Sequence, residues 1–132
     1  FFYHKKLSED KEALGYLKNR GVTSGTIKEF RIGLAPPEWR DLFQYLLSRG
    51  VVESDMLSMG LIKKKDGQEV SYYDTFRGRI LFPINDSSGR VVGVSGRILV
   101  DDGKSPKYLN SSPNTIPLSE TSCCTARLIW AV

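Results

Sequence analysis

The sequence is poor in the residues that build disulfides and metal sites. Its 132 residues contain two cysteines, Cys123 and Cys124, and a single histidine, His4. Because the two cysteines are adjacent, they can neither close a loop with each other nor supply the spaced thiolates of a zinc site. One histidine also leaves no credible Ser/His/Asp or Cys/His arrangement for nucleophilic catalysis. We interpret His4, which stands beside two lysines, as a surface residue.

Long apolar runs and phosphate-binding loops are missing as well. No stretch approaches the length of a membrane span, and residues 1–6 lack the apolar core of a signal peptide. We therefore expect a cytoplasmic protein without membrane contact. No Gly-x-x-x-x-Gly-Lys loop occurs. Acidic residues are scattered, and Asp101 and Asp102 share a glycine-containing turn that is typical of a loop. The sequence thus predicts no catalytic residue and no metal ligand.

What remains is an ordinary globular composition with an excess of positive charge. Hydrophobic residues make up 40% of the chain and charged residues 26%, with a formal net charge of +4. This length fits one domain with its own core. The positive charge is compatible with a polyanionic partner, and equally with lysines that are simply solvated.

The first half of the chain carries helical patterns separated by glycine and proline. Helices are predicted over residues 8–20, 23–30, 38–49 and 54–59. Ser8 and Thr23 are the predicted N-caps of the first two. Trp39, at the start of the third, is interpreted as a core residue.

The second half changes to strand patterns. A strand begins at residues 61–62 and ends in a charged hairpin tip, residues 63–67, whose three lysines we interpret as solvated. Residues 80–84 form a continuous apolar run, and the turn-rich stretch 85–89 folds residues 91–98 back as an antiparallel neighbour. The predicted fold is therefore α+β, with N-terminal short helices followed by a small, strongly bent antiparallel sheet.

The last of these strands has two different sides. Alternation places Val92, Val94 and Ile98 on the core side. The other side, with Val91, Gly93, Ser95 and Arg97, is nearly bare apart from the arginine. Glycine in a strand often marks the close approach of another backbone, and a phosphodiester backbone is one such visitor.

Basic and aromatic residues gather around these strands. The candidate DNA-binding residues are Arg77, Arg79, Arg97, Lys107, Tyr108 and Asn110. The cations would contact phosphates from one glycine-lined face, Tyr108 would stack on a base, and Asn110 would contact sugar or base. An alternative stays open, in which the arginines pair with Asp74 or Asp86 and merely hold a loop.

Three ordered motifs make this segment resemble a known family. They are Tyr-Asp-x-Phe-Arg-x-Arg-Ile-x-Phe-Pro-Ile at residues 73–84, Gly-Arg-Val-x-Gly-x-x-Gly-Arg at residues 89–97 and Pro-Lys-Tyr-Leu-Asn-Ser at residues 106–111. Residues 30–36 match a further segment, Phe-x-x-Gly-x-Ala-Pro. The chain thereby resembles the N-terminal subdomain of the catalytic core of bacterial DnaG-type DNA primases.

The resemblance implies a part in primer synthesis for DNA replication. In the family, this subdomain presents a basic surface that guides the single-stranded DNA template toward a neighbouring Toprim subdomain, where magnesium or manganese would be bound. A zinc-binding domain precedes the core, and the replicative helicase of the primosome would be contacted through other regions. On this interpretation the chain is a fragment of a nucleotidyltransferase, holds no cofactor itself and is inactive alone.

The resemblance fades after Asn110. We assign residues 1–118 to the subdomain and residues 119–132 to an atypical tail. One hypothesis is that the tail is read out of frame, because codons permitted for residues 123–126, shifted by one frame, can spell the family's Leu-Tyr-Gly. The alternative is a divergent linker.

The leading hypothesis is therefore a template-binding subdomain with weak sequence specificity and salt-sensitive affinity. Two other classes stay open. A non-catalytic module for single-stranded nucleic acid would share the basic groove. A protein-interaction domain would instead show a contiguous apolar patch and little salt-dependent affinity for DNA.

Overall fold

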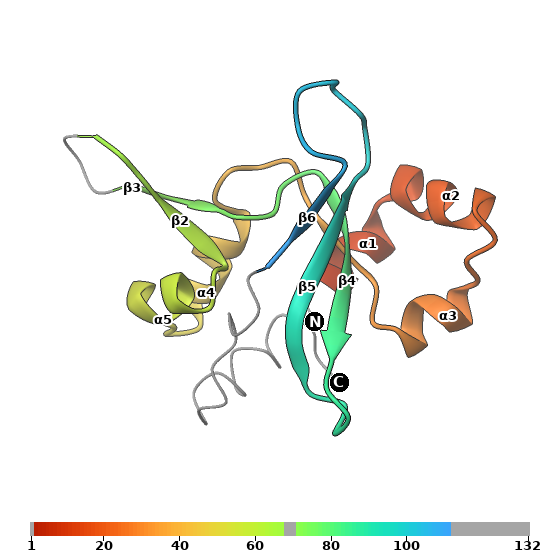
Figure 1. Cartoon of the computed structure of the whole chain (residues 1–132), viewed down its shortest axis with the longest axis horizontal. Coiled ribbons are helices and arrows are strands. Elements are labelled where there is room, and N and C mark those ends of the chain that lie inside the picture. Colours follow the sequence, from red (N-terminus) through yellow and green to blue (C-terminus); the bar gives the residue numbers. More distant parts are fainter. Residues whose placement is uncertain (1, 68–70, 112–132) are drawn as a thin grey trace.

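The computed structural model describes residues 2–67 and 71–111 and has the predicted α+β fold (Figure 1). In chain order its elements are α1 (Phe2–Glu9), α2 (Lys11–Asn19), α3 (Ser24–Glu29), β1 (Gly33–Ala35), α4 (Asp41–Ser48), α5 (Glu53–Ser58), β2 (Ile62–Lys65), β3 (Ser71–Asp74), β4 (Arg79–Asn85), β5 (Val91–Ile98) and β6 (Tyr108–Asn110). No helix in the described part of the chain is long and apolar enough to cross a membrane.

Side-chain caps explain where the N-terminal helices begin. Asp10 is the N-cap of α2, because its carboxylate accepts a hydrogen bond from the backbone N–H of Ala13 at 2.9 Å. The predicted start at Ser8 is wrong: Ser8 lies inside α1, and its hydroxyl donates to a carbonyl of that helix. Thr23 caps α3 as predicted, with its side chain accepting a backbone hydrogen bond in the first turn.

Two antiparallel sheets stand where a single sheet was predicted. Four strands form one sheet in the order β1-β4-β5-β6, and β2 and β3 form a separate two-stranded ribbon. Figure 1 shows the ribbon projecting to one side of the long β4–β5 hairpin. The predicted hairpin tip at residues 63–67 is in part wrong, since β2 continues through Lys65.

Both faces of the four-stranded sheet are covered by helices (Figure 1). Leu81 packs with residues of α4 and α5, whereas its neighbour Ile80 packs with residues of α1, α2 and α3. Successive side chains of a strand point to opposite faces, so a strand with a core on each side is apolar at every position. This explains the apolar residues 80–82, whereas Ile84 at the far end of the run is exposed.

Helix α1 packs closely against the edge strand β1. A Cβ on Gly33 would lie 2.6 Å from the Cβ of Tyr3, so the approach of helix to strand requires glycine. His4 on the same helix is half-buried, with Nδ1 at 3.1 Å from the carbonyl oxygen of Ile32. The prediction of a plain surface residue is therefore wrong: His4 joins α1 to the residue before β1.

Strand β5 departs from simple alternation at its start. Val94 is buried as predicted, but Val91 also lies in the core while Val92 is only half-buried. The cause is a bulge on β5: Ile84 pairs with Gly93 and Asn85 with Val91, so Val92 is an extra residue that shifts the alternation before it. Local sequence pattern does not reveal such a bulge.

The glycines of β5 serve packing inside the domain. A Cβ on Gly96 would lie 3.0 Å from side-chain atoms of both Phe76 and Leu81, and one on Gly93 would lie 3.2 Å from the hydroxyl of Ser111. The chain's own side chains thus occupy the space that the sequence suggested for a phosphodiester backbone. That part of the prediction is wrong.

Candidate nucleic-acid interface

Arg77 contacts two aromatic rings at the base of the ribbon. Its guanidinium carbon is 4.1 Å from the ring centroid of Trp39 and 5.2 Å from that of Tyr73. The two rings meet edge to face at 5.6 Å, and one guanidinium N–H donates to the backbone carbonyl of Asp74. We call Trp39, Tyr73 and Arg77 the Trp39 cluster. It holds a cation in place beside a flat ring, the combination that binds phosphates and bases of a single strand.

Trp39 is exposed, which contradicts its predicted place in the core. Its accessible fraction is 61%. It lies in the loop between β1 and α4, and its carbonyl accepts a 2.7 Å hydrogen bond from the N–H of Asp74. The partners of the indole come from a segment far along the chain. The only local signal is the Pro36-Pro37 pair, which places Trp39 in a loop without saying what it contacts.

A buried carboxylate fixes the loop and helix behind the Trp39 cluster. Asp74 accepts hydrogen bonds from the backbone N–H groups of Leu42 at 2.8 Å and Phe43 at 3.0 Å, and so caps the start of α4 from β3. Burial raises the pKa of Asp74 to about 6, although these hydrogen bonds act to lower it. Arg77 bonds to the backbone carbonyl of Asp74 and not to this carboxylate.

Arg79 is buried and joins neighbouring strands. Only 5% of its surface is exposed, and one guanidinium nitrogen lies 3.3 Å from the carbonyl oxygen of Gly96 and 3.4 Å from that of Lys107. Burial, together with the nearby charge of Arg77, lowers the pKa of Arg79. A phosphate contact by Arg79 stays a prediction, and it would require these backbone bonds to be shared.

A second group of cations and rings lies on α2 and the open edge of the sheet. The guanidinium carbon of Arg97 is 5.5 Å from the ring centroid of Tyr108 and 5.7 Å from that of Tyr16, and its Nη1 donates to the Tyr108 hydroxyl at 2.9 Å. The guanidinium carbon of Arg20 lies 5.2 Å from the centroid of Tyr16. We call these four residues the Tyr108 cluster. Its outer member, Tyr108, is 55% exposed.

The two clusters lie on opposite faces of the four-stranded sheet. Arg97 is directly opposite Ile80 on one neighbouring strand and Tyr108 on the other, so these side chains share the face covered by α1, α2 and α3. The Trp39 cluster belongs to the side of α4 and the ribbon (Figure 1). The expectation of one basic face carrying all three arginines is therefore wrong, because the structure separates Arg97 from Arg77.

Lys107 and Asn110 flank Tyr108 on the edge strand. The Lys107 side chain is 72% exposed, and its Nζ lies 3.8 Å from a carboxylate oxygen of Asp101. Such an exposed pair is weak and easily exchanged for a phosphate. Asn110 is exposed and directly opposite Ser95, on the same face as Tyr108. Both residues are exposed beside the open edge of the sheet.

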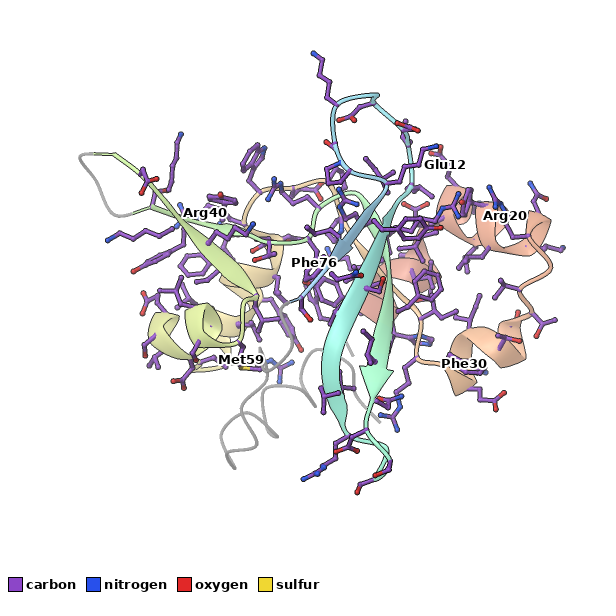
Figure 2. The ribbon with its side chains drawn as sticks, viewed as in Figure 1. Glu12, Arg20, Phe30, Arg40, Met59 and Phe76 are labelled. Atoms are coloured by element: carbon purple, nitrogen blue, oxygen red, sulfur yellow. The ribbon has the colours of Figure 1, made fainter. Side chains whose placement is uncertain are left out.

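A groove of about 680 Å³ runs beside the Trp39 cluster. Its charged lining residues are Lys63, Arg77, Arg79, Asp10, Glu12 and Asp102. Backbone N–H groups of Ser105 and Lys104 lower the pKa of Asp102 to about 2. Figure 2 shows Glu12 on α2, across the β5–β6 loop from the ribbon. The groove is thus positive at the ribbon and negative toward α2, which favours phosphates at the ribbon end.

The described residues offer no metal site of the usual kind. Within 2–67 and 71–111, no three His, Cys, Asp or Glu side chains come together as a metal ion would require. Asp101 and Asp102 accept hydrogen bonds from the backbone of residues 103–105 and so shape their own loop, as predicted. The two cysteines and the tail at residues 119–132 lie outside the described residues.

The fold and these two clusters define an α+β domain with the surface chemistry of nucleic-acid-binding proteins. The chain belongs to the family of the N-terminal domain of the DNA primase catalytic core, whose sequence model matches residues 2–117. This confirms the family that the three motifs indicated.

Curated relatives and solved structures agree with this assignment. The chain is 37% identical over 115 residues to a DNA primase of Clostridium acetobutylicum and 46% identical over 99 residues to one of Deinococcus radiodurans, covering 87% and 75% of this chain. It spans only 18% and 17% of those relatives.

Among solved structures, a DnaG primase catalytic domain bound to single-stranded DNA matches with a TM-score of 0.71 and 35% identity, over 89% of this chain and 36% of that one. The zinc-binding and RNA polymerase domains of the Aquifex aeolicus primase match with a TM-score of 0.74 and 34% identity, over 85% of this chain and 27% of that one. The fold is thus that of one part of the DnaG catalytic core.

Proposed function

We propose that this domain binds the single-stranded DNA template of a DNA primase that synthesises short RNA primers. The observation that carries the proposal is the Trp39 cluster, in which Arg77 contacts two rings at the positive end of a groove. A similar domain in a primase structure with bound single-stranded DNA supports it. Primer synthesis itself is an activity of the whole protein, of which this chain matches less than a fifth of the length.

Binding would combine charge and stacking. Arg77, Arg97 and Lys107 would contact phosphates, because each presents N–H donors at the surface. Trp39 and Tyr108 would stack on bases, and purines and pyrimidines would both be accepted because every base has a flat face. Asn110, Arg79 and the remaining cations would contribute less. This chemistry gives affinity with little sequence preference.

The chemical step would need groups that the described residues do not bring together. Nucleotidyl transfer uses divalent metals held by clustered carboxylates, and no such cluster occurs among residues 2–67 and 71–111. We infer that magnesium or manganese is held by a neighbouring Toprim subdomain, and that a zinc-binding domain and contacts with a replicative helicase belong to other parts of the same primase. This domain would then orient the template without reacting.

Fluorescence anisotropy of a labelled single-stranded oligonucleotide tests the proposal. We expect binding that weakens with salt, with log affinity falling against log salt at a slope of roughly −2 if three phosphates are neutralised. Lys107→Ala should weaken binding and make the slope shallower by about 0.7. Absence of binding at low salt would contradict the proposal, and binding without salt dependence would contradict its electrostatic basis.

A further inference from the structure

The β2–β3 ribbon has one anchored face and one open face. On the anchored face Ile62 and Asp74 are directly opposite each other and buried, and Tyr72 packs on Phe43 of α4 with ring centroids 5.7 Å apart. Lys64 is opposite Tyr72 in the register and therefore belongs to this face. These contacts fix the ribbon against the body of the domain.

The open face carries two lysines in line with the Trp39 cluster. Lys63 is directly opposite Tyr73, and Lys65 follows two residues along the same strand, so both side chains lie on the face of Tyr73. Lys63 also lines the same groove as Tyr73 and Arg77. Both lysines are exposed, and neither takes part in an ion pair found among the described residues.

We propose that this open face is a further phosphate-binding surface, on which Lys63 and Lys65 bind successive phosphates of a single DNA strand continuing from the Trp39 cluster. The inference rests on the proposed template-binding function and extends the site along the ribbon. It also replaces the interpretation of the lysine triplet as solvated: two of the three lysines bind DNA, and Lys64 does not.

The geometry of an extended strand suits this role. Residues two apart on one β-strand are roughly 6.6 Å apart, close to the separation of neighbouring phosphates on an extended nucleic-acid backbone. A lysine ammonium is a compact charge on a flexible stem, so it reaches a phosphate without demanding one orientation. Tyr73 links Lys63 to Arg77, because it is directly opposite Lys63 and its ring contacts the Arg77 guanidinium. The three cations therefore form a continuous row.

The row predicts different roles for neighbouring lysines of equal charge. Each of three variants, Lys63→Gln, Lys64→Gln and Lys65→Gln, removes one positive charge from the same strand. Lys64 lies on the anchored face of the ribbon, and the other two lysines lie on the open face. With a labelled 20-nucleotide oligothymidine, we expect Lys63→Gln and Lys65→Gln each to weaken binding about threefold at low salt and to make the salt slope shallower by about 0.7. We expect Lys64→Gln to weaken it less than about 1.5-fold.

The same titrations distinguish the failure of the ribbon site from the failure of the proposed template binding. Equal weakening by all three glutamine variants would mean a diffuse positive field and would overturn the ribbon site, as would wild-type affinity in all three. Arg77→Ala, measured in parallel, reports on the Trp39 cluster. Weakening by Arg77→Ala alone would leave template binding standing without the ribbon, and absence of binding by the wild-type chain would remove both.

Discussion

Arg77 and Arg79 are two residues apart, yet their guanidinium groups do different things. Arg77 contacts the rings of Trp39 and Tyr73 at the surface, and Arg79 is buried against the backbone carbonyls of Gly96 and Lys107. A buried donor that loses its place leaves acceptors without partners, whereas a surface cation loses only a weak contact. Within a single motif, therefore, Arg79 contributes mainly to the stability of the fold and Arg77 is the residue available for binding.

We expect Arg79→Ala to lower the free energy of unfolding by roughly 2 kcal/mol, because the carbonyls of Gly96 and Lys107 lose their donor inside the domain. Arg77→Ala should change it by less than about 1 kcal/mol. Arg77→Ala should instead weaken oligonucleotide binding about tenfold at low salt, by the loss of a phosphate contact and of the support for Trp39. Urea unfolding and anisotropy measure the two effects.

Equal stability of the two variants would show that the buried arginine is not needed for the sheet. If folded Arg79→Ala, checked by circular dichroism, binds as weakly as Arg77→Ala, the buried guanidinium also reaches DNA. The original assignment of a phosphate contact to Arg79 would then hold.

The burial and contacts of single residues were the hardest features to predict from the sequence. Trp39 was expected in the core, but its ring rests on Arg77 and Tyr73, which the fold brings from a distant segment. His4 was expected at the surface and instead contacts the carbonyl of Ile32. In both cases the deciding partner is remote in sequence, so neither periodicity nor composition could indicate it.

At the scale of elements, Asp74 links the ribbon to α4, and this link depends on pH. The ordinary pKa of the group is 3.8, and burial raises it to about 6 in the folded chain. At pH values between 3.8 and about 6, the folded state binds more protons than the unfolded state, so the free energy of unfolding falls as pH rises. From pH 4 to pH 7 the loss amounts to roughly 2 kcal/mol.

The Asp74→Asn variant isolates this effect, because its amide does not titrate. We expect the difference in unfolding free energy between wild type and Asp74→Asn to shift against the wild type as pH is raised from 4 to 7, measured by urea unfolding at several pH values. Parallel pH profiles would show that the hydrogen bonds from Leu42 and Phe43 offset burial and keep the pKa of Asp74 ordinary. Asp74→Ala, which leaves both N–H groups unpaired, serves as the destabilised reference.

Elements were predictable where the deciding chemistry is local. Thr23 caps α3 within one turn, and the turn-rich residues 85–89 close the β4–β5 hairpin, both as predicted. The start of α2 was misplaced because Ser8 and Asp10 are both good N-caps, and hydrogen-bond geometry chooses between them. The division into a sheet and a ribbon depends on strand pairing across the whole chain, which local patterns do not specify.

At the scale of the molecule, the four-stranded sheet divides the basic surface in two. The Trp39 cluster lies on the side of α4 and the ribbon, and the Tyr108 cluster lies on the side of α2 (Figure 1). Ordered motifs in the sequence were enough to indicate the family, because several motifs in one order are specific to that family and so identify its fold. They could not indicate this division, because motifs give the order of residues along the chain and not the face that each one occupies.

The division predicts how affinity depends on the length of the bound strand. A single strand reaches both clusters only if it passes from one face of the sheet to the other, so a short oligonucleotide of roughly four nucleotides occupies one cluster at a time. For such a probe, removing one cluster leaves the other available, and we expect Arg77→Ala or Arg97→Ala alone to weaken binding only about twofold.

A long strand engages both clusters at once, and its affinity gains from the high effective concentration of the second contact. For a 20-nucleotide probe the losses in log affinity of the two variants should therefore add in the double variant. Anisotropy titrations with both lengths test this. A short probe that loses nearly all affinity on Arg77→Ala, with no effect of Arg97→Ala at either length, would confine DNA to the Trp39 side and leave the Tyr108 cluster a purely structural role.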